Sequence, residues 1–539
     1  MTPQRPSFLL AGLSLLALGL ALPVLALLAS WFNLDAQVSQ IWSEMAATVL
    51  PDYVLTSLWL CLGVGLGVIG VGTASALLVT LFEFRGRRWM EWALLLPMAM
   101  PAYVLAYAYT DFLQYSGPLQ HALRQAFGWQ GRVLPEVRSL GGAMIVFTLA
   151  LYPYVYVLAR AALAERAHPL MEAARLLGAP YGRRVWRVAL PLARPAVAAG
   201  VALALMEVLA DFGVSSYFGI QTFTAGIYKA WLAMDNRMAA AQLSTALLAV
   251  VALLLAWEKK AQSRQRFAGS RPARTGPESQ PTPLHGARAW AAQLACALPV
   301  LLGFVLPVLI LLHTLNSSDV ALSLSLGRFL NWAGNSLMLA ALTAILATLL
   351  ALLLSAQLRL QPGPWTRCLS GGVGLGYAMP GAVVVVGLLL PLGAAQARWP
   401  DWGVGHWLTA SILGLVWAYL VRFVAVAQQS VQSGYARIPS AVDDGARMLG
   451  ISGLRLVWRV HGPLLRRPLA AAALLVFVDV MKELPVTLVL RPFDTDTLAV
   501  MAHQLARDER LGEAALPALA LVAVGLLPVL LLSRALRQR

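Results

Sequence analysis

Four carboxylates stand inside the apolar parts of this 539-residue sequence, in two pairs with the same spacing: Glu207 with Asp211, and Asp479 with Glu483. Residues four apart share one face of a helix, so each pair is expected to point in one direction. An ionised acid at the bilayer centre costs about 2.5–3.5 kcal/mol on insertion scales and marks a functional site by default. Carboxylate oxygens suit hard cations. We therefore expect the four acids to line a cation pathway, with direct metal ligation less favoured because a transported ion must leave.

A structural role is the alternative for these acids: they would accept hydrogen bonds from neighbouring helices or pair internally, and Lys482 beside Glu483 is a candidate partner. A second polar group follows Pro101 and consists of Tyr103, Tyr107, Tyr109 and Asp111. For that group, an aromatic belt near the outer membrane surface is the favoured interpretation.

The elements that must position these residues are membrane-spanning helices. With 59% hydrophobic residues, 12% charged residues and a mean hydropathy of +0.70, the composition is not that of a soluble protein. A spanning helix needs about 20 mostly apolar residues, and about twelve runs meet that need. They are 8–31, 56–82, 92–115, 139–162, 196–222, 239–257, 290–313, 333–356, 370–395, 408–427, 468–491 and 513–533. We interpret the first run as a retained helix rather than a signal peptide, because it is long and contains Pro23.

The net charge of +16 reports topology rather than nucleic-acid binding. If the N-terminus is inside, most of the 41 Lys and Arg residues fall in the loops and membrane edges on that side, as the positive-inside rule requires. Both termini are therefore expected in the cytoplasm, and the basic loops are expected to attract anionic lipid headgroups. The three cysteines have no metal-ligand spacing and imply no disulfide framework.

An internal repeat divides the chain into two halves. Residues 172–194 align without gaps on 444–466, with 12 of 23 positions identical. The segment 259–288, rich in Pro, Ser, Gly and Arg, is predicted to be a cytoplasmic linker between a first half, 1–258, and a second half, 289–539. Six spans in each half make the halves parallel repeats, which leave a pathway on their shared axis.

The repeated loop carries its own helix signals. A helix is predicted to open after His168–Pro169 and to end at Gly178, which suits a left-handed cap. Pro180 prevents direct continuation, and a second short helix is predicted to end at Pro191. A basic interfacial helix that grips only lipid headgroups is the alternative. Two copies with the same Gly and Pro spacing favour a docking role, because headgroup binding needs no fixed turn.

This loop resembles the EAA loop of permease subunits of binding-protein-dependent ABC importers. The matching residues are Glu172, Ala173, Ala174, Gly178 and Pro191, and their counterparts in the second copy are Asp444, Ala446, Gly450 and Pro463. The resemblance implies that 163–195 and 435–467 are coupling loops that dock on a separate ATPase, in two copies. The second copy departs from the pattern at Asp444–Gly445 and at Gly462, so equal strength of the two docking sites does not follow.

The resemblance covers nearly the whole chain and is strongest to fused, two-half permeases for ferric iron. The residues that resemble this group are 206–228, 477–500 and 507–519. It implies an all-α fold of the type I importer permease in the bacterial inner membrane and a solute-binding protein that delivers ferric iron. It implies no cofactor on this chain, since ATP and Mg belong to the ATPase. The sequence contains no GxxxxGK[ST] and no acid/base or nucleophile arrangement of an enzyme.

Two other transport functions stay open from the residues alone. Related fused permeases carry thiamine and other small solutes, although an anion would sit poorly beside the four acids. A carrier driven by an ion gradient would use the same acids as proton relays. Such a carrier has no reason to duplicate the coupling loop.

Overall fold

The computed structural model describes residues 8–32, 36–267, 281–317, 325–374, 376, 379–403, 408–409 and 411–537. It is built of helices, with one short parallel strand pair, β1 (Phe82–Glu83) and β2 (Thr282–Pro283), among these residues. The chain divides into two compact units, each of which takes segments from both sides of the predicted linker. The boundaries 1–258, 259–288 and 289–539 therefore stay a prediction about the sequence repeat.

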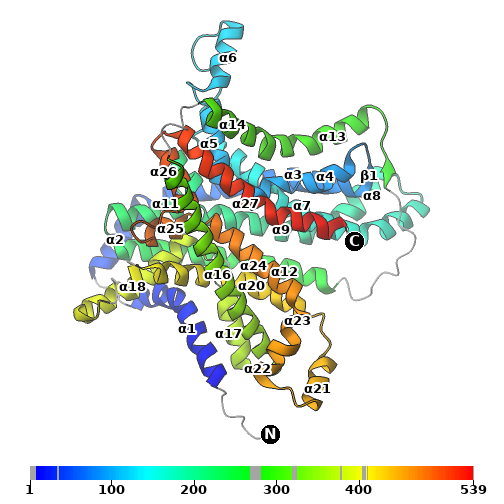
Figure 1. The fold of residues 1–539 in the computed structure, drawn as a ribbon. Coiled ribbons are helices and arrows are strands. Elements are labelled where there is room, and N and C mark those ends of the chain that lie inside the picture. The colour runs from blue at the N-terminus through cyan, green and yellow to red at the C-terminus, as the bar shows by residue number, and fades with distance from the viewer. Residues whose placement is uncertain are drawn as a thin grey trace. The chain divides into compact units, whose positions relative to one another are not determined.

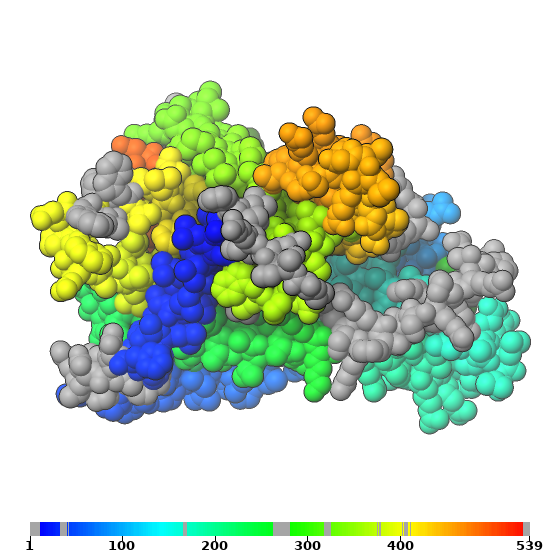
Figure 2. All heavy atoms as spheres, turned by 90° about the horizontal axis from the view of Figure 1, so that it is seen from below, coloured from blue at the N-terminus to red at the C-terminus, as the bar shows by residue number. Residues whose placement is uncertain are grey.

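The first unit comprises Met1–Met45, Gly226–Leu248 and Ser325–Met501. Its centre is formed by α16, α20 and α24, which pack on one another, while α1 lies against α17 and α18 (Figures 1 and 2). The backbone of α1 approaches α18 closely at Gly387, where a Cβ would stand 2.5 Å from the carbonyl oxygen of Pro23. The helices of this unit are α1 (Phe8–Ala29), α16 (Leu326–Leu360), α17 (Pro364–Gly374), α18 (Gly381–Arg398), α20 (Ile412–Tyr435), α21 (Ser440–Met448), α22 (Gly453–Leu456), α23 (Gly462–Leu464), α24 (Arg466–Met481) and α25 (Pro485–Leu490).

The second unit comprises Ala46–Ala225, Ala249–Leu324 and Ala502–Arg539. Helices α3, α7 and α9 form its centre, and α14 and α27 pack on each other and on α5. Its helices are α3 (Leu50–Leu81), α4 (Arg87–Ala93), α5 (Ala102–Leu113), α6 (Pro118–Phe127), α7 (Leu140–Leu176), α8 (Tyr181–Arg184), α9 (Leu190–Ala210), α10 (Gly213–Phe218), α13 (Ala287–Val300), α14 (Leu306–Ser317) and α27 (Leu511–Arg537). Four of the described helices cross a boundary between the units: α2 (Ala36–Ala47), α11 (Phe223–Tyr228), α12 (Arg237–Phe267) and α26 (Leu498–Arg507).

The first helix of each sequence half packs in the unit that holds most of the other half. Helix α1 lies in the unit of α16, α20 and α24, and α13 with α14 lies in the unit of α3, α7 and α9. The linker also does more than connect. Its first residues, as far as Phe267, continue α12, and Thr282–Pro283 pairs as β2 with β1.

A glycine on α3 and one on α9 allow close packing against α7. A Cβ at Gly72 would lie 2.8 Å from the Val155 Cβ and 2.9 Å from the Tyr152 carbonyl oxygen. A Cβ at Gly200 on α9 would lie 2.7 Å from the Val155 Cα. Small residues let helix backbones approach where lipid offers no hydrophobic driving force.

Ten of the described helices are long and apolar enough to cross a membrane, and a bent pair brings the number to eleven. Ten of the twelve predicted runs correspond to these helices, and the other two, 92–115 and 468–491, are interrupted. In the first, the chain bends by 89° between Arg87–Ala99 and Ala102–Phe127, because Pro101 has no N–H and forces extended backbone on Met100. In the second, α24 ends at Met481 after 16 residues and α25 begins at Pro485.

Candidate functional site

The helix that holds Glu207 ends before Asp211. Helix α9 stops at Ala210, and Asp211 has extended backbone, with φ −73° and ψ 135°. Its Oδ2 accepts hydrogen bonds from the backbone N–H of Val214, at 2.9 Å, and of Ser215, at 3.3 Å. The carboxylate thus caps α10, where the first N–H groups of a helix have no partner in the helix itself.

Glu483 does the same at the equivalent place in the other repeat. Its Oε1 and Oε2 accept the N–H groups of Val486 and Thr487, both at 3.0 Å, at the start of α25. Its side chain is 1% exposed and forms an ion pair of 2.7 Å with Arg422. Lys482, the adjacent residue, is the candidate partner that the sequence offers. The ion pair that the structure shows is with Arg422.

The helix expected to hold both acids of each pair ends before the second acid. Asp211 and Glu483 lie at breaks in the helices, since α9 ends at Ala210 and α24 at Met481. The physical reason is that a break inside a membrane frees backbone N–H groups, and a carboxylate placed there satisfies them. Glu207 is exposed and Asp479 is half-buried on the preceding helices. Within each unit, the described His, Cys, Asp and Glu residues form no group of three or more that could hold a metal ion. The pathway role of the four acids stays a prediction.

Both predicted coupling loops contain the same helix end. Gly178 and Gly450 each have φ +76°, the left-handed conformation that favours glycine. The N–H of Ala179 bonds to the carbonyl of Ala174 at 3.0 Å, and the N–H of Ile451 bonds to that of Ala446 at 2.9 Å. These bonds are the Schellman pattern, in which the turn closes on the last carbonyls of the helix.

Each of these turns presents a matched pair of large apolar side chains that the sequence analysis did not single out. Leu176 and Leu177 are 86% and 87% exposed, and Met448 and Leu449, at the equivalent positions, are 88% and 80% exposed. The segment α21–α23 forms an orange lobe at the surface in Figure 2. Large exposed apolar side chains that recur at the same place in two copies of a polar loop are typical of protein interaction sites. The repeated sequences Arg-Leu-Leu-Gly and Arg-Met-Leu-Gly could have indicated these pairs, because each places two large apolar residues directly before the glycine of the turn.

The other predicted loop residues lie around these turns. Glu172, Ala173 and Asp444 are exposed, Ala174 is half-buried and Ala446 is buried. Two boundaries in the first loop were predicted wrongly. Helix α7 runs through His168–Pro169 without a break, and Tyr181–Ala210 is helical throughout, so no helix ends at Pro191. A π-helical turn, Val185–Ala189, changes the hydrogen-bond register just before that proline. Pro463 likewise follows a π turn and opens α23.

A buried polar network supports the second loop. Asp443 accepts from Arg359 Nε at 2.7 Å and contacts His461 Nε2 at 3.0 Å, and His461 Nδ1 lies 3.0 Å from the Tyr435 hydroxyl. Burial by itself would raise the pKa of Asp443, but the hydrogen bonds and charges of Arg359 and His461 outweigh it and lower that pKa from 3.8. In the first loop, Met171 and Ala189 occupy the positions of Asp443 and His461. The two loops are therefore held by different forces.

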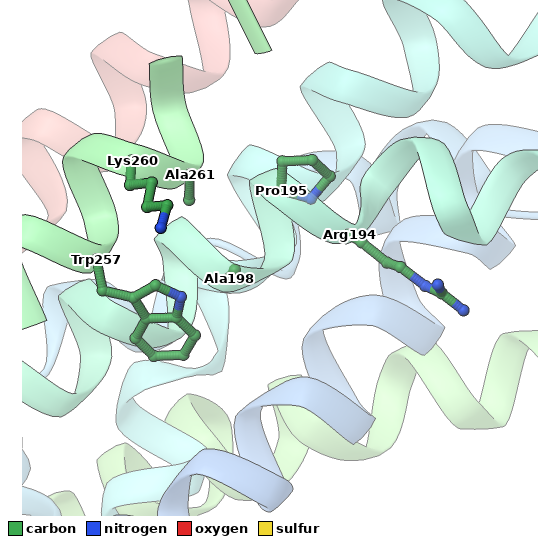
Figure 3. A pocket seen from close by; sticks show the side chains of 6 residues that line it. All are labelled: Arg194, Pro195, Ala198, Trp257, Lys260 and Ala261. Carbon is green, nitrogen blue, oxygen red and sulfur yellow. The ribbon is translucent and has the colours of Figure 1, made fainter. Parts of the chain in front are cut away.

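A cavity of about 320 Å³ opens between α9 and α12 at the end of the first loop. Its lining consists of Arg194, Pro195, Ala198, Trp257, Lys260 and Ala261. In Figure 3 the Lys260 side chain extends toward Trp257, while that of Arg194 turns away. None of the six is acidic, so the cavity does not suit a cation. Its basic groups and indole suit an anionic group at the membrane surface.

The family described as "Binding-protein-dependent transport system inner membrane component" matches residues 67–257 and 347–539. The chain belongs to this family. Each matched range contains one copy of the loop and most spans of one repeat. The protein is therefore a polytopic α-helical transport permease of the type I fold, built from two repeats.

Several curated relatives are similar to this permease. The Fe(3+)-transport system permease protein FbpB 2 of Haemophilus influenzae is 25% identical over 539 residues, which cover 99% of both chains. The sulfate transport system permease protein CysW of Escherichia coli is 28% identical over 240 residues, or 40% of this chain and 78% of that protein. The putative 2-aminoethylphosphonate transport system permease protein PhnU of Salmonella typhi is 27% identical over 219 residues, or 40% of this chain and 72% of that protein.

Proposed function

We propose that this permease is the membrane channel of an ATP-driven importer for ferric iron. The observation that supports ferric iron as the substrate is the similarity to the Fe(3+) permease over 99% of both chains. The similarities to the sulfate and phosphonate permeases cover about 40% of this chain. Asp211, the acid at the helix break of the first repeat, also favours a cationic over an anionic substrate. A carrier driven by an ion gradient has no use for the paired docking turns.

The same proposal assigns the partners. Two copies of an ATPase dock at 163–195 and 435–467, and their ATP and Mg do not bind to this chain. A periplasmic or extracellular solute-binding protein delivers the ion from outside. The chain lies in the inner membrane with both termini in the cytoplasm, and its basic cytoplasmic face contacts lipid headgroups. Support comes from the family's dependence on binding proteins and from the exposed apolar pairs on both turns.

In this arrangement the permease performs no hydrolysis. Closure of the ATPase pair moves the two coupling loops, and rigid helices carry that movement to the membrane part, which alternates between outward and inward access. A cation passes most easily where hydrogen-bonded carboxylates offset the cost of leaving water without holding it permanently.

Transport by the reconstituted complex tests the proposal. Proteoliposomes that contain the permease and its ATPase, with ATP inside and the binding protein outside, should accumulate radiolabelled ferric iron. Omission of ATP and a Walker-lysine variant of the ATPase serve as controls. Sulfate and thiamine are offered in parallel. Saturable, ATP-dependent uptake of either of these without iron uptake would overturn the substrate, and ATP-independent uptake would overturn the mechanism.

A further inference from the structure

The cavity of about 320 Å³ between α9 and α12 plays no part in the proposed transport of a cation. It lies where two membrane spans end beside the first coupling loop. Arg194 and Pro195 stand near the start of α9, and Lys260 and Ala261 end the span Arg237–Ala261. All of the lining residues belong to the second unit. In the proposed function the coupling loops face the cytoplasm, so this end of both spans lies on the cytoplasmic side of the membrane.

Short side chains on α9 leave this space open. The α9 wall consists of Pro195, Ala198 and the stem of Arg194, whose guanidinium turns away from the cavity in Figure 3. On the α12 side, Ala261 is small, and Trp257 contributes the face of a large aromatic ring. The cavity is therefore bounded mostly by apolar groups, although it opens at the charged edge of the membrane.

Two hydrogen-bond donors lie on the α12 side of the cavity. In Figure 3 the Lys260 side chain extends toward Trp257, and the nitrogen of the indole is on the ring edge that faces Ala198. No hydrogen bond joins that indole N–H to another described residue. Glu258, the neighbouring acid on α12, is not part of the lining. The polar end of the cavity thus offers an ammonium group and an N–H, which together suit an anionic oxygen.

The other repeat lacks these two donors. When the last spans of the two repeats are aligned on their shared Asp-x-Arg, Trp257 and Lys260 correspond to Leu530 and Ser533. Several basic residues of the coupling loop, in contrast, recur in both repeats. The fold and its orientation in the membrane are therefore achieved in the second repeat without the Trp and Lys pair. Its presence in one repeat indicates a task that is done once per molecule.

We propose that this cavity binds one anionic phospholipid of the cytoplasmic leaflet. The phosphate accepts hydrogen bonds from Lys260 and Trp257, and the acyl chains continue along the apolar wall. Basic pockets between membrane helices on the cytoplasmic side bind anionic headgroups, and indoles lie at the level of those headgroups. A free phosphate would use the two donors but leave the apolar wall in water, whereas a lipid covers both. The site rests on the proposed function for its side of the membrane and adds a partner to it.

A lipid bound here connects the first coupling loop to the last span of its repeat. The chain is helical from Tyr181 to Ala210, so α9 continues from the loop without a break. A movement of the loop therefore also moves the α9 wall of the cavity. A ligand that binds one of two states more tightly shifts the equilibrium toward that state. We expect ATP-driven transport to depend on anionic lipid through this one cavity.

Native mass spectrometry of the purified full-length permease tests the site directly. Delipidated permease titrated with phosphatidylglycerol should retain one molecule that phosphatidylcholine with the same acyl chains does not replace. Lys260→Glu reverses the charge in the cavity and should weaken this binding about thirtyfold. Lys259→Glu is the matched control, because Lys259 is exposed and adjacent but is not part of the lining. It changes the net charge by the same amount and should leave the binding nearly unchanged.

Ala198→Phe is a second variant, which fills the cavity without changing its charge and should also remove the tightly bound lipid. Its melting temperature shows that it is folded, and Lys260→Glu at an exposed position should melt like the wild type. Glycerol phosphate carries the phosphate without acyl chains. Displacement of phosphatidylglycerol by millimolar glycerol phosphate would indicate a site for a free anion and overturn the lipid assignment. Equal binding in Lys260→Glu and Lys259→Glu, or equal retention of both lipids by the wild type, would overturn the site.

The binding measurement uses the permease alone, so it needs neither the ATPase nor iron. Iron uptake by wild-type proteoliposomes combined with equal lipid binding in the two lysine variants would overturn the site and leave the proposed function standing. Lipid binding that depends on Lys260 without iron uptake would support the site and contradict the transport function. Where the wild type takes up iron, phosphatidylglycerol should stimulate uptake in Lys259→Glu but not in Lys260→Glu. Equal stimulation in both variants would overturn the link between this lipid and transport.

Discussion

Asp211 and Glu483 stand 272 residues apart at equivalent positions of the two repeats, and each carboxylate accepts the first N–H groups of the short helix that follows it. They differ in their surroundings. Glu483 is paired with Arg422, whereas the first repeat has Ala150 at the position of that arginine. The same cap is therefore combined with a neutralising partner in one repeat. This difference assigns Glu483 to the framework and makes Asp211 the better candidate for contact with a cation.

Removing the partner of Glu483 tests the first half of that assignment. In Arg422→Gln the carboxylate stays buried without its counter-charge, which should cost about 3–5 kcal/mol of stability. The melting temperature of the purified permease should fall by several degrees. The double variant Arg422→Gln with Glu483→Gln should recover most of the loss, because a neutral amide needs no counter-charge. A double variant no more stable than the single one would contradict the pairing.

Two substitutions separate the cap of Asp211 from its charge. Asp211→Asn keeps an oxygen that can accept the N–H groups of Val214 and Ser215, so stability should change little. Asp211→Ala removes the cap and should cost about 1 kcal/mol. If the charge assists the cation, iron uptake should fall strongly in both variants, although only the alanine variant is less stable. Normal uptake in Asp211→Asn would leave this acid a purely structural role.

The exposed apolar pairs should carry the docking of the ATPase. In Leu177→Asp, a charge replaces an apolar side chain at the docking surface. The free energy of ATPase binding should weaken by about 2 kcal/mol, which raises the dissociation constant of the ATPase–permease complex about thirtyfold. Leu449→Asp makes the same change in the second turn. Binding of the ATPase to the permease in nanodiscs, followed by interferometry, measures both. Phe493→Asp is the control, because Phe493 is 98% exposed but lies outside both turns. Equal loss in the control would show a general effect of charge.

The lowered pKa of Asp443 predicts an acid-sensitive second loop. A carboxylate with a folded-state pKa below its ordinary 3.8 adds stability that is fully present above 3.8 and is lost as the pH falls through the folded value. The groups that face it are Arg359 and His461, with Tyr435 behind the imidazole. Between pH 5 and 8 the contribution of Asp443 to the stability of the loop should stay constant. Below about pH 4, pepsin should cut 435–467 faster than 163–195. In Asp443→Asn, pepsin should cut 435–467 faster than 163–195 even at the highest pH at which pepsin is active.

The sequence was sufficient for what is local or repeated. Apolar length located most spans, and the shared spacing of Gly178 and Gly450 predicted both left-handed turns. It was insufficient wherever a residue's role depends on a distant partner. Two acids four residues apart have the spacing of a helix face whether or not the helix continues, and Arg422 is 61 residues from Glu483. Tyr107, expected in an aromatic belt, is 2% exposed. Its hydroxyl lies 2.6 Å from Nδ1 of His503, which is 396 residues away, so no pattern linked them.

Gly72 of α3 packs against α7 in the second unit, and Gly70 on the same helix is a matched control. Gly72→Ala should destabilise the permease by about 1–3 kcal/mol, because the new methyl group meets the Tyr152 carbonyl and the Val155 side chain on α7, where the backbone has no room to give. Gly70→Ala, two residues earlier, meets nothing within 4 Å. It should be neutral or stabilising by about 0.5–1 kcal/mol, since alanine restricts the unfolded chain. Thermal unfolding in the same detergent compares the two, and equal melting temperatures would show that α3 and α7 do not pack as closely as described.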